Sequence, residues 1–202
     1  LKEKLFPKLS DDKYFLVVID NLRYDQWLTI KPTVEELFDV EEEELYLSLL
    51  PTTTQYSRNA LFSGLTPKEI KQKYPDKWVS EEEEGGKNLH EEYLLHENIK
   101  RNHVNVKMSY NKITQLKTGK KLVNQFSNLL QNDFNTIVYN FVDTLSHVRS
   151  EMEVIKELAE DEAAYRSITL SWFKHSPLYE LFQKMKDNNC KVMITTDHGT
   201  VR

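Results

Sequence analysis

Cysteine is almost missing from this 202-residue chain, which contains Cys190 alone. A single thiol excludes an internal disulfide framework of the kind that stabilises small secreted proteins, so the composition favours a reducing, cytoplasmic location. Cys190 precedes an apolar run, and we expect it to be a buried packing residue rather than a nucleophile.

Long hydrophobic runs and an excess of positive charge are missing as well. No apolar stretch approaches the ~20 residues that a transmembrane helix requires, and residues 1–5 lack the apolar core of a secretory signal. We therefore expect no membrane insertion. The formal net charge of −5 argues against broad coating of nucleic acid, which needs a basic face. It does not exclude a phosphate substrate, because bound metal ions reverse the local charge.

The residues that are present suit an ordinary folded domain. The chain is 39% hydrophobic and 29% charged, which is typical of globular proteins, and its length allows one sizeable core. We expect a single domain over residues 1–202. We also expect it to be truncated at its C-terminus, because Arg202 follows a site-like motif within a few residues.

Four short apolar runs are typical of buried strands: Tyr14–Ile19, Leu45–Leu50, Asn135–Val142 and Lys191–Thr196. Helical spacing occurs between them, in residues 119–130 and in two segments of 151–189 that divide near residues 175–177. This alternation predicts a mainly parallel sheet in a three-layer α/β/α sandwich. Residues 66–118 are more polar and contain the acidic run Glu81–Glu84 followed by two glycines. We interpret them as an insertion or lid outside the sheet.

Acidic and imidazole side chains follow three of the predicted strands. Asp20 follows the first, Asp143 and His147 follow the third, and Asp197 and His198 follow the fourth. Open α/β sheets bind ligands at these strand ends, and one helical turn would let Asp143 and His147 face the same point. Oxygen and nitrogen donors at one edge of a sheet suit one or two zinc-like ions.

Each of these motifs also has a simpler explanation. Asp20 could cap the following helix, and Asp143 and Asp197 could lie on the surface or in a capped loop. The combination of three such motifs, each at the end of a predicted strand, favours a metal site over three unrelated loops.

A hydroxyl-rich segment, Pro51–Thr54, comes just before a predicted helix that Gly64 is placed to end. Each threonine taken alone is better explained as a helix cap. A hydroxyl at a helix N-terminus nevertheless lies where a phosphate is favoured, and a neighbouring zinc ion would make it a nucleophile. Arg58, one turn further on, could clamp that phosphate through two hydrogen bonds.

These motifs resemble the alkaline phosphatase superfamily. The first aspartate, the Pro-Thr-x-Thr segment, Asp-x-x-x-His and Asp-His-Gly occur in that superfamily's order. Three segments are closer still to the PglZ domain: Val18–Trp27, Leu50–Ala60 and Phe141–His147. Among PglZ proteins the chain is most similar to the effector domain of PorX-type response regulators.

The resemblance implies two zinc ions and a role for each motif. The mixture of carboxylate and imidazole donors also favours zinc, with manganese as the competitor. The resemblance selects Thr54 as the nucleophile, and the position of Arg58 beyond it makes Arg58 the candidate for binding the substrate. The first ion would have four ligands: Asp20, Thr54, Asp197 and His198. The second ion would have Asp143 and His147, together with a further histidine expected beyond the end of this chain.

The function implied by the resemblance is that of a phosphodiesterase or phosphatase acting on nucleotide or oligonucleotide phosphodiesters through a threonyl-phosphate. The enzyme would be a cytoplasmic response-regulator output domain in the regulation of type IX secretion, dimerising through a receiver domain that this chain lacks. The alternative is a non-catalytic signalling module that keeps its metal site for structure and binds a protein partner such as a sigma factor.

Overall fold

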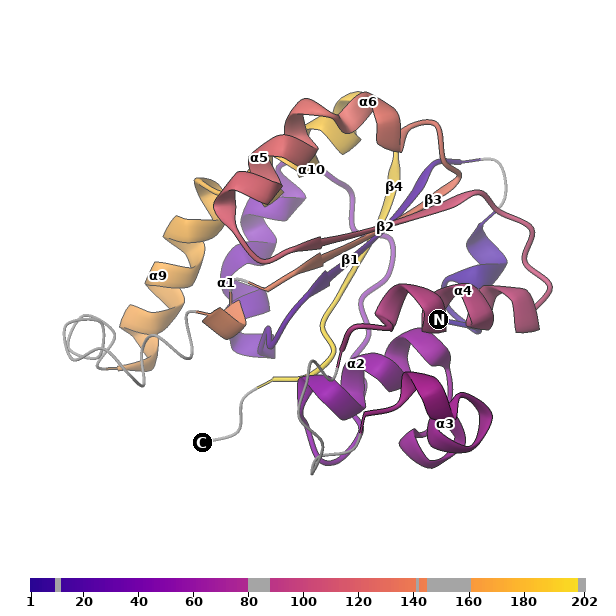
Figure 1. The fold of residues 1–202 in the computed structure, drawn as a ribbon. Coiled ribbons are helices and arrows are strands. Elements are labelled where there is room, and N and C mark those ends of the chain that lie inside the picture. The colour runs from indigo at the N-terminus through magenta and orange to yellow at the C-terminus, as the bar shows by residue number, and fades with distance from the viewer. Residues whose placement is uncertain (10–11, 80–87, 141, 145–160, 200–202) are drawn as a thin grey trace.

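A four-stranded parallel sheet forms the centre of the computed structural model, which describes residues 1–9, 12–79, 88–140, 142–144 and 161–199. The strands lie in the order β2-β3-β1-β4, and every neighbouring pair is parallel (Figure 1). Their bounds are β1 (Tyr14–Ile19), β2 (Met108–Ile113), β3 (Phe134–Tyr139) and β4 (Lys191–Thr195).

β1 lies inside the sheet, and all six of its residues are buried. Because successive side chains of a strand point to opposite faces, Phe15, Val17 and Ile19 join one core while Leu16 and Val18 join another. A continuous apolar run is therefore what this position requires, as in other parallel sheets covered on both faces.

The first core is covered by α1 (Tyr24–Glu35), α5 (Leu116–Asn124), α6 (Phe126–Leu129), α9 (Glu162–Lys174) and α10 (Pro177–Asp187). The second is covered by η1 (Phe6–Lys8), α2 (Thr54–Ser63), α3 (Pro67–Lys73) and α4 (Glu91–Arg101), with η2 (Pro75–Lys77) after α3. Helices on both faces of a parallel sheet confirm the predicted three-layer α/β/α sandwich.

The prediction of a strand at Leu45–Leu50 is wrong. These residues form no strand, and Leu47 and Leu50 are 98% and 81% exposed. The sheet position next to β3 is taken instead by β2, whose residues Met108–Lys112 are only half-buried. An edge strand can carry polar residues, since one side of it meets solvent, and this composition hid β2 from apolar patterning.

The expectation that residues 66–118 lie outside the sheet is therefore wrong for Met108–Ile113. Parts of the same segment also build the second core, through Ile70 of α3 and Leu94 of α4. The predicted division of the C-terminal helices is confirmed, since α9 ends at Lys174 and α10 begins at Pro177. Cys190 is buried as expected. Within the described ranges, no helix combines the length and the apolar character needed to cross a bilayer.

Candidate metal centre

Two aspartates lie at the carboxyl ends of neighbouring parallel strands. Asp20 directly follows β1, and Asp197 lies two residues beyond the end of β4. The Asp20 amide donates to the carbonyl of Tyr139 at 2.9 Å and so extends the β1–β3 ladder by one step. Both aspartates are buried, at 1% and 2% exposed, in the region where open α/β sheets bind ligands.

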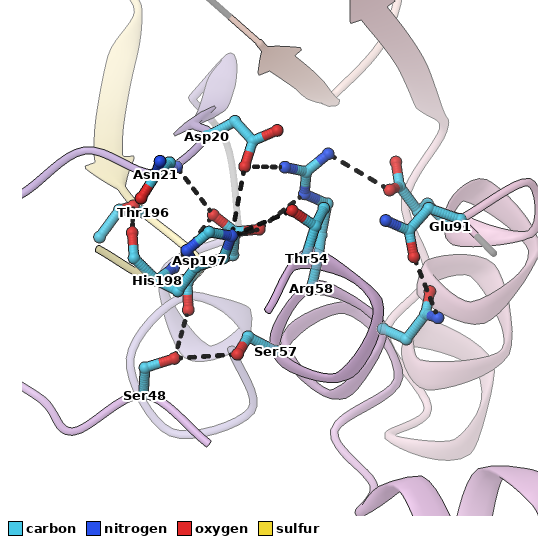
Figure 2. A network of polar contacts seen from close by, with 12 residues as sticks. Asp20, Asn21, Ser48, Thr54, Ser57, Arg58, Glu91, Thr196, Asp197 and His198 are labelled. Carbon is cyan, nitrogen blue, oxygen red and sulfur yellow. Dashed lines mark hydrogen bonds and ion pairs between the residues drawn. The ribbon is translucent and has the colours of Figure 1, made fainter. Parts of the chain in front are cut away.

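Hydrogen bonds between the two loops fix the Asp197 carboxylate (Figure 2). Its Oδ1 accepts the backbone N–H of His198 at 3.0 Å and that of Asn21 at 3.3 Å. Asn21 has φ of 60°, in the left-handed region that asparagine tolerates better than most residues. The N–H of Leu22 donates to the Thr196 hydroxyl at 3.1 Å. Hydrogen bonds from the residues after β1 and from the neighbouring His198 thus orient the Asp197 carboxylate.

His198 completes a cluster of potential metal ligands. Its Nε2 lies 3.6 Å from Asp20 Oδ1 and 3.8 Å from Asp197 Oδ2, and one ligand atom from each residue lies within 4.8 Å of the others. Thr54, the first residue of α2, brings its Oγ1 to 3.0 Å from the same Nε2. Three buried donors and a half-buried hydroxyl therefore meet at one point.

Arg58 contacts this cluster from α2, one helical turn after Thr54. Its Nε donates to Asp197 Oδ2 at 2.9 Å, and its Nη2 forms an ion pair with Asp20 Oδ1. Nη1 lies 3.4 Å from Oε1 of Glu91. Burial of the guanidinium would lower its pKa, but the attraction of the three carboxylates outweighs that effect and raises it. Arg58 is thus a permanent positive charge inside the cluster.

The electrostatics of the cluster favour a further cation. Burial raises the pKa of Asp197, and the neighbouring Asp20 charge raises it further, although Arg58 and His198 oppose the shift. An added divalent ion would offset both the energetic cost of burying the two carboxylates and the repulsion between them.

The donor set of the cluster fits a metal ion. One ligand atom from each of Asp20, Asp197 and His198 lies within 4.8 Å of the others, and the buried Asp20 Oδ2 finds no hydrogen-bond partner among the described residues. Buried polar atoms are rarely left in this state. Carboxylate, imidazole and hydroxyl donors together suit zinc, and manganese as well.

Asp143 and His147, the predicted ligands of a second ion, have different outcomes from the residues of this cluster. Asp143 lies four residues beyond the end of β3 and is half-buried, and it does not belong to the ligand cluster identified within the described part of the chain. His147 lies outside the described residues, so the second ion stays a prediction. The alternative that Asp20 caps a helix is wrong, because the residue before α1 is Arg23.

Sequence reasoning missed the residues on the far side of Arg58. Glu91, at the start of α4, is 1% exposed and accepts a hydrogen bond from the Tyr110 hydroxyl. Lys112 Nζ lies 3.1 Å from the same carboxylate. The two-residue spacing of Tyr110 and Lys112 on β2 was the available signal, since it places both side chains on one face of the sheet.

Comparison with known families gives the chain its identity. The family model described as the BREX system PglZ alkaline phosphatase-like domain matches residues 1–202. A search of curated proteins found no significant match. Because the model covers the whole chain, the protein belongs to the PglZ family of alkaline phosphatase-like domains, and this membership indicates a phosphoester hydrolase type of function.

Proposed function

We propose that this PglZ domain is a metal-dependent phosphodiesterase with Thr54 as its nucleophile. The main support is the 3.0 Å contact between Thr54 Oγ1 and His198 Nε2, which joins a hydroxyl at a helix N-terminus to a buried Asp-Asp-His cluster. A cluster that served only to stabilise the fold would not need a half-buried hydroxyl beside it.

The cluster would hold a zinc ion, with manganese as the competitor, through Asp20, Thr54, Asp197 and His198. A bound dication supplies a Lewis acid that lowers the pKa of an adjacent hydroxyl and neutralises phosphoryl oxygens. We propose that a second ion is held by Asp143 and His147, following the resemblance to the superfamily.

The residues of the chain then act on a phosphodiester in two steps. In the first, Thr54 Oγ1 bonds to phosphorus, the bond from phosphorus to one ester oxygen breaks, and the alcohol leaves with a proton. In the second, water adds to phosphorus, the Thr54–phosphate bond breaks, and Thr54 regains its hydroxyl proton. The N-terminus of α2 favours the phosphate beside Thr54 in both steps.

A role for Arg58 in binding the substrate phosphate belongs to this proposal. The side chain is fully buried and its guanidinium contacts three carboxylates. Binding a phosphate therefore requires Arg58 to exchange a carboxylate partner for the substrate. Nucleotide or oligonucleotide phosphodiesters are the substrate class that the resemblance supports.

The test compares Thr54→Ala with the wild-type chain in hydrolysis of bis(p-nitrophenyl) phosphate, with zinc or manganese added. We expect Thr54→Ala to lose at least about 10³-fold in kcat, since removal of a nucleophile abolishes the covalent route. Mass spectrometry of acid-quenched wild type should find a p-nitrophenyl phosphoryl group on Thr54, because only one of the two ester bonds breaks in the first step. Thr53→Ala is the matched control, because Thr53 is exposed and its side chain makes no capping hydrogen bond. A wild type that hydrolyses nothing with either metal would refute the proposal.

A partner-binding module is the second candidate, and one observation favours it. Large apolar side chains are exposed in the segment that crosses the Asp197 loop: Leu45, Tyr46, Leu47 and Leu50. Ser48 fastens this segment to the site by donating to the Asp197 carbonyl at 2.7 Å (Figure 2). In a PorX-like response regulator such a surface would receive a protein such as a sigma factor in the cytoplasm. This function would be favoured if the wild type showed no hydrolytic activity and if Thr54→Ala left partner binding intact.

A further inference from the structure

Glu91 is a buried carboxylate outside the Asp20–Asp197–His198 cluster. It accepts a hydrogen bond from Tyr110, and Lys112 Nζ lies 3.1 Å from its Oε1. Burial raises the pKa of Tyr110, and the Glu91 charge raises it further, so the phenol stays a donor. A buried carboxylate is costly unless such partners surround it, and here they orient the Glu91 side chain.

Arg58 joins Glu91 to the metal-ligand cluster. Its guanidinium binds Oδ1 of Asp20 and Oδ2 of Asp197, and these two oxygens are also the ones measured as nearest to His198 Nε2. A metal ion held by the cluster would lie beside the same two carboxylates. The ion and the guanidinium are both cations, so they compete for this position.

The third contact of Arg58, with Glu91, is an ion pair that lies outside the metal-ligand cluster. Nη1 lies 3.4 Å from Glu91, a longer contact than the 2.9 Å from Nε to Asp197. The guanidinium therefore lies closer to the cluster and already faces Glu91. The three carboxylates exceed Arg58 and Lys112 by one negative formal charge, which offsets part of the charge of an added dication.

We propose that Glu91 is a positioning residue that holds the Arg58 guanidinium when a metal ion binds Asp20 and Asp197. Glu91 thereby strengthens metal binding without contacting the ion. This inference rests on the proposed function, because it assumes that the cluster binds a metal ion.

The test measures the zinc affinity of the chelator-treated chain by competition with a chromophoric zinc chelator. Glu91→Gln removes the carboxylate that pairs with Arg58. We expect its zinc affinity to fall about tenfold, a loss typical of changing residues that support metal ligands without contacting the metal. Glu92→Gln is the matched control, since it makes the same change on the adjacent, exposed residue of α4. We expect that variant to stay within about twofold of wild type.

A second pair of variants separates positioning from a general loss of structure. Arg58→Met removes the competing cation and should bind zinc more tightly than wild type, although it is less stable without metal. Adding Glu91→Gln to Arg58→Met should then leave zinc affinity unchanged, because Glu91 acts through Arg58. Equal weakening by Glu91→Gln in both backgrounds would overturn the inference. If Arg58→Met does not fold, Arg58→Gln takes its place in the same cycle.

The outcomes distinguish this inference from the proposed function. A wild type that binds no zinc and no manganese refutes the proposed metal site and the inference together. A wild type that binds zinc and hydrolyses a phosphodiester, while Glu91→Gln and Glu92→Gln behave alike, overturns the role of Glu91 and leaves the proposed function standing.

Discussion

Carboxylates occur in this protein in two contrasting settings. In the buried set, Arg58 is shared by three acids: Asp20, Glu91 and Asp197. In the surface set, acids that follow α1 each meet lysines: Glu41 with Lys191, Glu42 with Lys4 and Lys8, and Glu43 with Lys31. Ion-pair geometry is similar in the two sets, and burial distinguishes them.

The difference shows what each set contributes. An exposed ion pair is typically worth about 0–1 kcal/mol, because water and salt screen it. A buried pair is costly to desolvate, and removing one partner leaves the other charge unpaired in a medium of low dielectric constant. The surface set therefore helps to hold the irregular segment 40–50 against the domain at little cost. The buried set adds little net stability, and its arrangement suits the metal site that we propose.

The largest expected effect separates the two sets directly. Arg58→Met should lower the free energy of unfolding by about 3–5 kcal/mol in the presence of chelator, because Asp20 and Asp197 are left buried without their cation. Lys191→Met is the matched change in the surface set, where Lys191 and Glu41 are both exposed, and it should lower the free energy of unfolding much less, because water and salt screen an exposed pair. Denaturant unfolding measures both values. Similar losses from the two variants would show that burial does not separate the two sets.

An intermediate effect is expected from metal addition. Zinc at about 100 times its Kd should raise the free energy of unfolding by about 2.7 kcal/mol, since only the folded state assembles the cluster. Thermal unfolding with zinc and after chelation measures this difference. In Asp20→Asn the zinc-dependent rise should be largely lost, whereas in Lys191→Met it should persist. A full rise in Asp20→Asn would mean that zinc binds elsewhere.

The smallest effect concerns the surface set and pH. Hydrogen bonds from Lys8 and Lys4 hold the pKa of Glu42 at about 2, below its usual value of 4.5. Because the folded-state pKa is depressed, the stabilisation is present above pH 4.5 and is lost as pH falls from 4.5 toward 2. NMR titration of the Glu42 carboxyl should show its midpoint rise toward 4.5 in 1 M salt or in Lys8→Ala, since exposed charges are screened. A midpoint insensitive to salt would show that this pair behaves like the buried set.

Local patterns in the sequence were enough to predict two strands of the sheet and the aspartates that follow them. The apolar runs of β1 and β4 are continuous because both faces of the sheet are covered, and short-range chemistry places Asp20 and Asp197 at their ends. The start of α2 at Thr54 and its end at Gly64, which has φ of 63°, follow from turn and helix chemistry within a few residues. Features that depend on neighbouring residues could therefore be predicted from the sequence.

Features that depend on distant residues could not. Leu45–Leu50 has the composition of a strand, but pairing with the sheet depends on distant residues, and the half-buried β2 occupies the place next to β3. Arg58 was predicted to lie ready for a phosphate, whereas the fold surrounds it with Asp20, Glu91 and Asp197, which lie between 33 and 139 residues away along the chain. A sequence pattern specifies which side chains a strand or helix presents to each face. Only the packing of those elements decides which charges become neighbours and which of them lose contact with water.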